Sequence, residues 1–167
     1  MSLEPLATYL NDHLTASVPA IRLMDALAER AEHPELAPIL RRVAGEVRED
    51  QQLLRDVLDR LRAGERRLAQ AAAVVGEKVH KGRLAFAARN HPALAMLEGL
   101  ESIALGLQGK LGLFRVLEEL APHDPRLAGL PFAARAARTE AQHSMIEEQR
   151  RAAAREAFEG VAPGATA

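Results

Sequence analysis

Four helix-forming stretches of nearly equal length make up most of this chain. They cover residues 3–31, 34–63, 92–121 and 131–159, and Pro or Gly residues lie near their boundaries. A helix of about 30 residues is roughly 45 Å long, so four of them can cover one another's apolar faces from end to end. The pattern predicts an all-α fold, a four-helix bundle.

The connection between the second and third stretches, residues 64–91, is unusually long. Neighbouring antiparallel helices are joined by roughly two to eight residues, so we expect this connection to cross the bundle from one end to the other. Leu68, Val75 and Val79 recur on one helical face. This period predicts a helix near 66–80 that packs against the bundle, and therefore a partly helical crossover.

The length of 167 residues is that of one domain. We expect this domain to span residues 1–160 and the tail, 161–167, to be disordered. The absence of Cys excludes disulfides, thiolate metal sites and Cys nucleophiles. The first residues lack the features of a secretory signal, and charged residues interrupt the most apolar region, 93–120, so we expect no transmembrane segment. The sequence therefore predicts a cytoplasmic protein.

Basic residues gather in residues 60–92, where only Glu65 and Glu77 carry negative charge. A basic segment of this kind can contact phosphates or an anionic membrane. Phe86 is its one aromatic residue, so base stacking has little support. We favour the interpretation that these cations neutralise carboxylates on the bundle, and we do not expect nucleic acid or an anionic membrane as a partner.

The third stretch is apolar on nearly all of its faces, and a helix of this kind is usually buried on most faces. Each of its glycines would cost about 1 kcal/mol relative to Ala in an exposed helix interior. We therefore expect another segment to approach this backbone closely at Gly99, Gly106, Gly109 and Gly112. The pattern predicts a homodimer formed through this helix.

Two polar residues interrupt apolar seams. His13 lies on the apolar stripe of the first stretch, and Asp50 lies on the heptad seam of the second. A buried polar group without a partner costs about 1–3 kcal/mol, so each of them needs one. In the structural interpretation, which we prefer, His13 and Asp50 form a buried polar pair, or either of them pairs with a neighbouring Arg or Gln, and this pair fixes the register of the two helices. In the functional interpretation both are metal ligands.

The fourth stretch contains Glu140-Ala-Gln-His143, a Glu-x-x-His sequence that places both side chains on one side of a helix. With its helix number, helix length and long second connection, the chain resembles the ferritin-like superfamily. Carboxylate proteins of that family hold two metal ions with one Glu from each of two helices and Glu-x-x-His from the other two. The resemblance implies a ferritin-like bundle and metal ligands drawn from His13, Glu46, Asp50, Glu101 (or Glu98), Glu140 and His143.

The match to that ligand set is incomplete. The second stretch has no His where the family has one, and the first offers Asp12 and His13 in place of Glu. Phosphate-binding glycine loops and the Gly-x-Ser-x-Gly motif are also absent. The chain thus resembles bacterial members with an incomplete di-iron ligand set. We predict a non-catalytic bundle without a cofactor that acts in binding or assembly. The alternative is a di-metal protein that uses iron, or another divalent metal, in iron or peroxide chemistry.

Overall fold

The computed structural model describes residues 3–63 and 91–159, and four long helices dominate them. The helices are α1 (Leu3–Arg30), α2 (Leu36–Ala63), α4 (Pro92–Leu120) and α5 (Phe132–Phe158), with a short 3₁₀ turn, η1 (Ala121–His123), after α4. In these residues the prediction of an all-α fold with four long helices is confirmed, and each helix end lies within two residues of its predicted position. The predicted helix near 66–80, its packing and the predicted tail at 161–167 lie outside the described residues.

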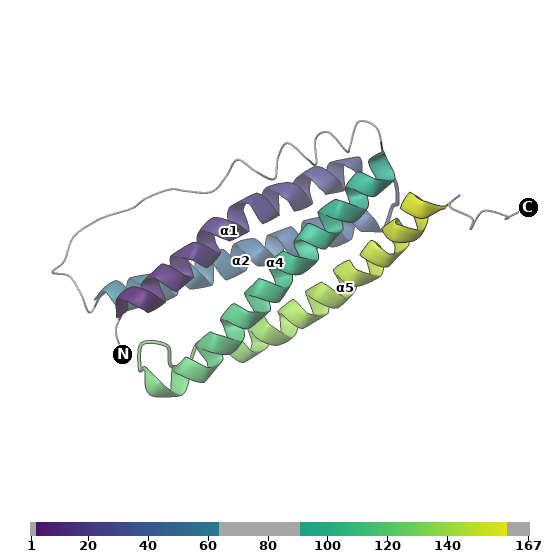
Figure 1. Ribbon diagram of the computed structural model, residues 1–167. Coiled ribbons are helices and arrows are strands. Elements are labelled where there is room, and N and C mark those ends of the chain that lie inside the picture. The colour runs from purple at the N-terminus through teal and green to yellow at the C-terminus, as the bar shows by residue number, and fades with distance from the viewer. Residues whose placement is uncertain (1–2, 64–90, 160–167) are drawn as a thin grey trace, which may run out of the picture.

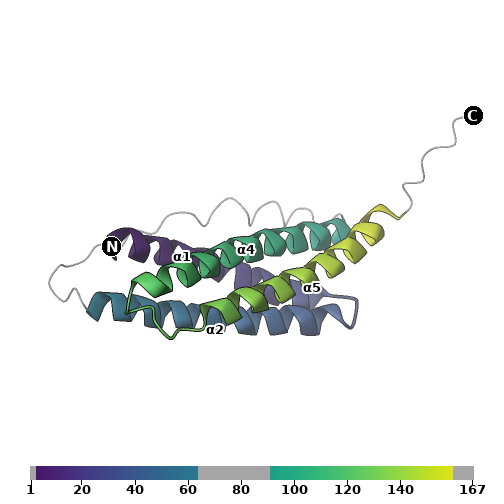
Figure 2. The same ribbon diagram turned by 90° about the horizontal axis from the view of Figure 1, so that it is seen from below.

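The helices form two antiparallel pairs that pack side by side (Figure 1 and Figure 2). α1 packs on α2 and α4 packs on α5, and the two pairs meet where α1 contacts α4 and α2 contacts α5. Because α1 and α5 run in one direction and α2 and α4 in the other, every neighbouring pair is antiparallel (Figure 1). α2 ends and α4 begins at opposite ends of the bundle. This is the helix order that a long second connection predicts.

The apolar core is divided into two clusters along the bundle axis. One cluster lies at the end of the bundle where α1 ends and α2 begins. It includes Met24, Leu40, Leu100 and Ile146. The other lies toward the opposite end and includes Leu10, Val57, Phe114 and Phe132. The middle of each helix lies between the two clusters, and this is where the buried polar residues Asp50, Gln51, Thr139 and Gln142 are found.

The glycines of α4 differ in their surroundings. A Cβ atom added at Gly99 would lie 2.7 Å from Leu27 Cδ1, so a neighbouring helix approaches the backbone closely there, as predicted. At Gly106, Gly109 and Gly112 the described residues place no atom within 4 Å of an added Cβ. These three glycines are exposed, so no described helix makes the predicted close approach there, and an approach by a second copy stays a prediction. Within the described ranges, none of the helices is both long and apolar enough to cross a membrane.

Candidate functional site

A layer of polar side chains crosses the middle of the bundle, between the two apolar clusters. All four helices contribute to it. We call it the central polar layer, and it consists of His13 and Ser17 on α1, Asp50 and Gln51 on α2, Lys110 on α4, and Thr139 and Gln142 on α5.

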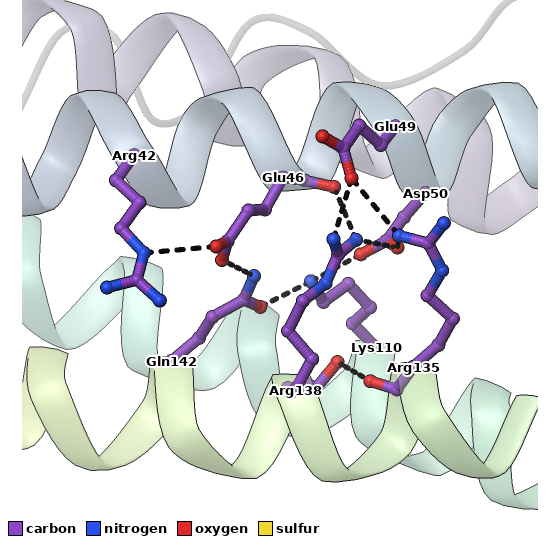
Figure 3. Close-up of polar contacts among 9 residues, drawn as sticks. Arg42, Glu46, Glu49, Asp50, Lys110, Arg135, Arg138 and Gln142 are labelled. Carbon is purple, nitrogen blue, oxygen red and sulfur yellow. Dashed lines mark hydrogen bonds and ion pairs between the residues drawn. The ribbon is translucent and has the colours of Figure 1, made fainter.

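Asp50 is the most heavily engaged member of this layer. Its side chain is almost completely buried and accepts hydrogen bonds from three cations (Figure 3). Lys110 Nζ donates to Oδ2 at 2.7 Å. Arg138 and Arg135 donate to Oδ1 at 2.6 Å and 3.2 Å. The carboxylate that interrupts the apolar seam of α2 is therefore neutralised by side chains from α4 and α5.

Lys110 enters the interior from α4. Its ammonium donates to Asp50 and also to Gln142 Oε1, at 2.6 Å. Only 11% of the side chain is exposed. Burial lowers the pKa of Lys110, although the neighbouring Asp50 carboxylate acts in the opposite direction. The ammonium thus connects an oxygen on α2 with an oxygen on α5.

Glu46 lies one helical turn before Asp50. Gln142 Nε2 donates to its Oε2 at 2.6 Å, and Arg42 Nε donates to its Oε1 at 3.1 Å. Burial raises the pKa of Glu46, but the hydrogen bonds from Gln142 and Arg42 outweigh it, so the pKa lies below its ordinary value. Glu46 is therefore ionised at neutral pH, and Gln142 bridges Glu46 to Lys110.

Glu49 lies on the solvent side of the ion pairs that Asp50 forms with Arg135 and Arg138. Its carboxylate accepts hydrogen bonds from Arg138 at 2.6 Å and from Arg135 at 3.2 Å, and these bonds lower the pKa of Glu49. Arg138 also donates to the main-chain oxygen of Glu46 at 3.1 Å. Two arginines of α5 thereby hold consecutive carboxylates of α2 (Figure 3).

The predicted pairing of His13 with Asp50 is replaced by other contacts. Asp50 is buried with polar partners, as predicted, but these are Lys110, Arg135 and Arg138. His13 is half-buried, and its ring packs edge-on against Tyr9 with the ring centroids 4.7 Å apart. Full cations stabilise a buried carboxylate better than an imidazole whose pKa is itself lowered by burial.

Glu140 and His143 share one side of α5, as their spacing predicts, but that side meets α4 near the surface. Glu140 forms an ion pair with Arg115, and His143 Nε2 lies 3.1 Å from Gln108 Nε2. The residue of α5 that points into the centre is Gln142, which is fully buried. The helix is rotated so that an amide occupies the place that the resemblance assigned to a ligand.

The remaining predicted ligands are also held by cations. Arg150 lies 3.4 Å from Glu101. Glu46 accepts from Arg42 and Gln142, and Asp50 accepts from three cations, as described above. In residues 3–63 and 91–159, no three His, Asp or Glu side chains form a group that could hold a metal ion. The structure therefore joins Glu46 and Asp50 through shared partners, Arg138 and the Lys110–Gln142 pair. It does not bring Glu101, Glu140, His143 or His13 into these contacts.

Lys110 and Gln142 are central residues that the sequence analysis missed. A usable signal was present, because Lys110 continues the three-and-four spacing of Ile103, Leu107, Phe114 and Leu117, which are all buried. Gln142 likewise lies between Thr139 and Ile146 in the three-and-four series of buried residues of α5 that begins at Ala136. Both residues interrupt apolar seams as Asp50 does.

Comparisons of the chain with models of protein families, with curated proteins and with solved structures find no match.

Proposed function

We propose that this chain is a ferritin-like bundle whose centre is held by ion pairs instead of a metal pair, and that it acts in assembly by binding a second copy of itself through α4. The order of its helices supports the first part, because the two parallel helices α2 and α4 are consecutive along the chain. The proposal assigns the chain no catalytic reaction.

The position of Lys110 supports a structural role for the centre. Its ammonium bonds oxygens from α2 and α5, 2.7 Å and 2.6 Å away, as a bound cation would. Asp50 also accepts from Arg135 and Arg138. A metal ion at this point would have to displace three cations from one buried carboxylate, which is an unfavourable exchange.

The observation that carries the assembly role is an exposed apolar strip on α4. Leu105 is 74% exposed and Val116 is 40% exposed. Gly109 and Gly112 lie between them on the same helical face, and both are exposed. An apolar strip of this kind marks a partner surface. Its small central residues allow a second helix to come close.

A two-fold axis through the middle of this strip makes the surface self-complementary. In an antiparallel pair of α4 helices, Leu105 of one copy meets Val116 of the other, and Gly109 meets Gly112. Symmetric dimers use one patch twice in this way. This geometry is what we propose for the homodimer.

Sedimentation velocity over a range of protein concentrations tests the assembly. We expect a dimer for the wild-type chain and a monomer for Leu105→Glu, because the new charge would be buried without a partner. Ala141→Glu adds the same charge at an exposed position of α5 and should stay dimeric. A wild-type monomer at every concentration, or a dimer that Leu105→Glu leaves intact, contradicts the proposal.

Aerobic addition of Fe(II) separates the proposal from the di-metal alternative. We expect no growth of near-ultraviolet absorbance and no stoichiometric iron after desalting. Binding of about two irons per chain, as in carboxylate proteins of this superfamily, and its loss in Glu140→Ala or His143→Ala, would favour the di-metal alternative. Ala141→Glu serves as the matched control on the same helix.

A further inference from the structure

A cavity of about 90 Å³ lies between α1, α2 and α4, next to the central polar layer. Apolar side chains form most of its wall, including Met24, Val47, Leu54, Ile103, Leu107 and Phe114. This is space for several water molecules or for one small organic molecule. A mostly apolar, partly open cavity of this size favours an apolar guest over water.

Two polar side chains on the α1 and α2 side of the cavity, Ser17 and Gln51, bond one another. Ser17 Oγ donates to the main-chain oxygen of Leu14 at 2.6 Å and accepts from Gln51 Nε2 at 2.7 Å. Gln51 Oε1 in turn accepts from Arg55 at 3.4 Å. These bonds are made within the protein, so Ser17 and Gln51 do not demand a polar guest. His13 also lines the cavity, and its ring packs edge-on against Tyr9.

Lys110 differs from Ser17 and Gln51 because only two of its three N–H groups have acceptors among the described residues. An ammonium has three N–H groups. Asp50 and Gln142 accept two of them, and the described residues form no further hydrogen bond with this nitrogen. Lys110 also lines the cavity. A charged donor in an apolar wall makes a strong hydrogen bond to an oxygen acceptor.

The charges around the cavity favour an uncharged guest. Lys110, Arg135 and Arg138 face three carboxylates, those of Glu46, Glu49 and Asp50. A fourth cation, Arg42, pairs with Glu46 but is 65% exposed, so the charges on the inner side of the network are balanced. The Asp50 carboxylate lines the cavity and would repel an anion, while Lys110 would repel a cation. An ion would in addition have to lose its water on entering an apolar space.

We propose that this cavity is a binding site for a small neutral molecule that has an apolar body and one carbonyl oxygen, with Lys110 as the hydrogen-bond donor to that oxygen. Such a guest fills the apolar space and accepts from the third N–H group of Lys110. The site is independent of the exposed strip on α4, so it can exist whether or not the chain forms a dimer.

Nuclear magnetic resonance titration of the full chain with three matched probes tests the ligand class. The probes are acetophenone, toluene, which lacks the oxygen, and benzoate, which carries a charge. We expect acetophenone to shift resonances of residues around the cavity and to bind about tenfold more tightly than either toluene or benzoate, as a charge-assisted hydrogen bond allows.

Two glycine variants test the location. Gly106 is an exposed residue that lines the cavity, and a Cβ atom added there meets no atom within 4 Å, so Gly106→Leu adds an apolar side chain at the edge of the cavity. Gly45→Leu on α2 is the matched control, since an added Cβ is equally free there and Gly45 does not line the cavity. We expect Gly106→Leu to weaken acetophenone binding about tenfold and Gly45→Leu to change it less than about twofold.

Lys110→Met tests the donor, because it keeps a flexible chain and removes the ammonium. Its affinity for acetophenone should fall to that for toluene. The proposal is overturned if the wild-type chain shows no shifts up to the solubility of acetophenone, if toluene or benzoate binds as tightly, or if Gly106→Leu binds like the wild type. Should Lys110→Met fail to fold, the three probes and the glycine variants decide the question.

Discussion

The ammonium of Lys110 lies 2.7 Å from the carboxylate of Asp50 and thereby joins α4 to α2, two helices that are not neighbours in the bundle. The contact passes through the interior from one antiparallel pair to the other. Because it requires both charges to be at the same height, it specifies how the two pairs align along the bundle axis. Buried polar contacts are best known for this kind of registry role.

Asp50→Asn should destabilise the fold by about 3 kcal/mol, because it leaves Lys110, Arg135 and Arg138 with less compensating charge in the interior. Urea unfolding followed by circular dichroism measures the change. Glu49→Gln is the matched control. It removes a charge that contacts the same two arginines at a position that is 59% exposed. Its effect should be much smaller, and equal effects would contradict the role of burial.

Gly99→Ala and Gly45→Ala should differ although both glycines lie inside a helix. Gly45→Ala should stabilise the chain by about 1 kcal/mol, the difference in helix propensity, since an added Cβ meets nothing there and Gly45 lies on α2, outside the proposed dimer contact. At Gly99 the same change forces Leu27 to move, which costs about 1–3 kcal/mol and cancels or reverses the gain. Thermal unfolding of the two variants gives the comparison. An equal gain at both positions would show that Leu27 moves freely.

Pro19→Ala should stabilise the chain by about 1–3 kcal/mol. Pro19 is exposed inside α1 and supplies no N–H to the helix, so Ala restores a hydrogen bond and relieves a steric clash. Pro38→Ala is the control. Pro38 lies in the first turn of α2, where an N–H would have no partner in the helix. Chemical unfolding should show a clear gain for the first variant and little change for the second.

Asp124 should make the stability of the fold depend on pH in the acid range. Hydrogen bonds from Arg126, from its side chain first and then its backbone, lower the pKa of Asp124 from 3.8 to about 2. Because the folded pKa lies below the unfolded one, this contribution is complete above pH 3.8 and is lost as the pH falls toward about 2.

Asp124→Asn tests this dependence, because Asn keeps a side-chain oxygen for the backbone N–H of Arg126 and loses the charge. Unfolding measured between pH 5 and pH 2 should show a shallower decrease in stability than the wild type shows, since the loss of proton-linked stability spans about these pH values. Asp59→Asn, at an exposed position on α2, is the control for net charge. A decrease as steep as in the wild type would exclude Asp124 as a source of acid sensitivity.

Local patterns determined the helices. The positions of Pro and Gly set the ends, and the three-and-four spacing of apolar residues set the buried faces, because both act within a few turns of one chain segment. The burial of Asp50 followed from the same spacing. The seam position of Lys110 was readable in the same way, from its place between Leu107 and Phe114.

Only the tertiary structure decided which groups meet. Asp50 takes its partners from α4 and α5, which lie far along the chain, and no local period encodes that choice. The rotation of α5 about its own axis turns Gln142 inward and Glu140 toward Arg115. The sequence places Glu140 and His143 on one side of a helix, but the packing of that helix against three others sets the direction in which this side points.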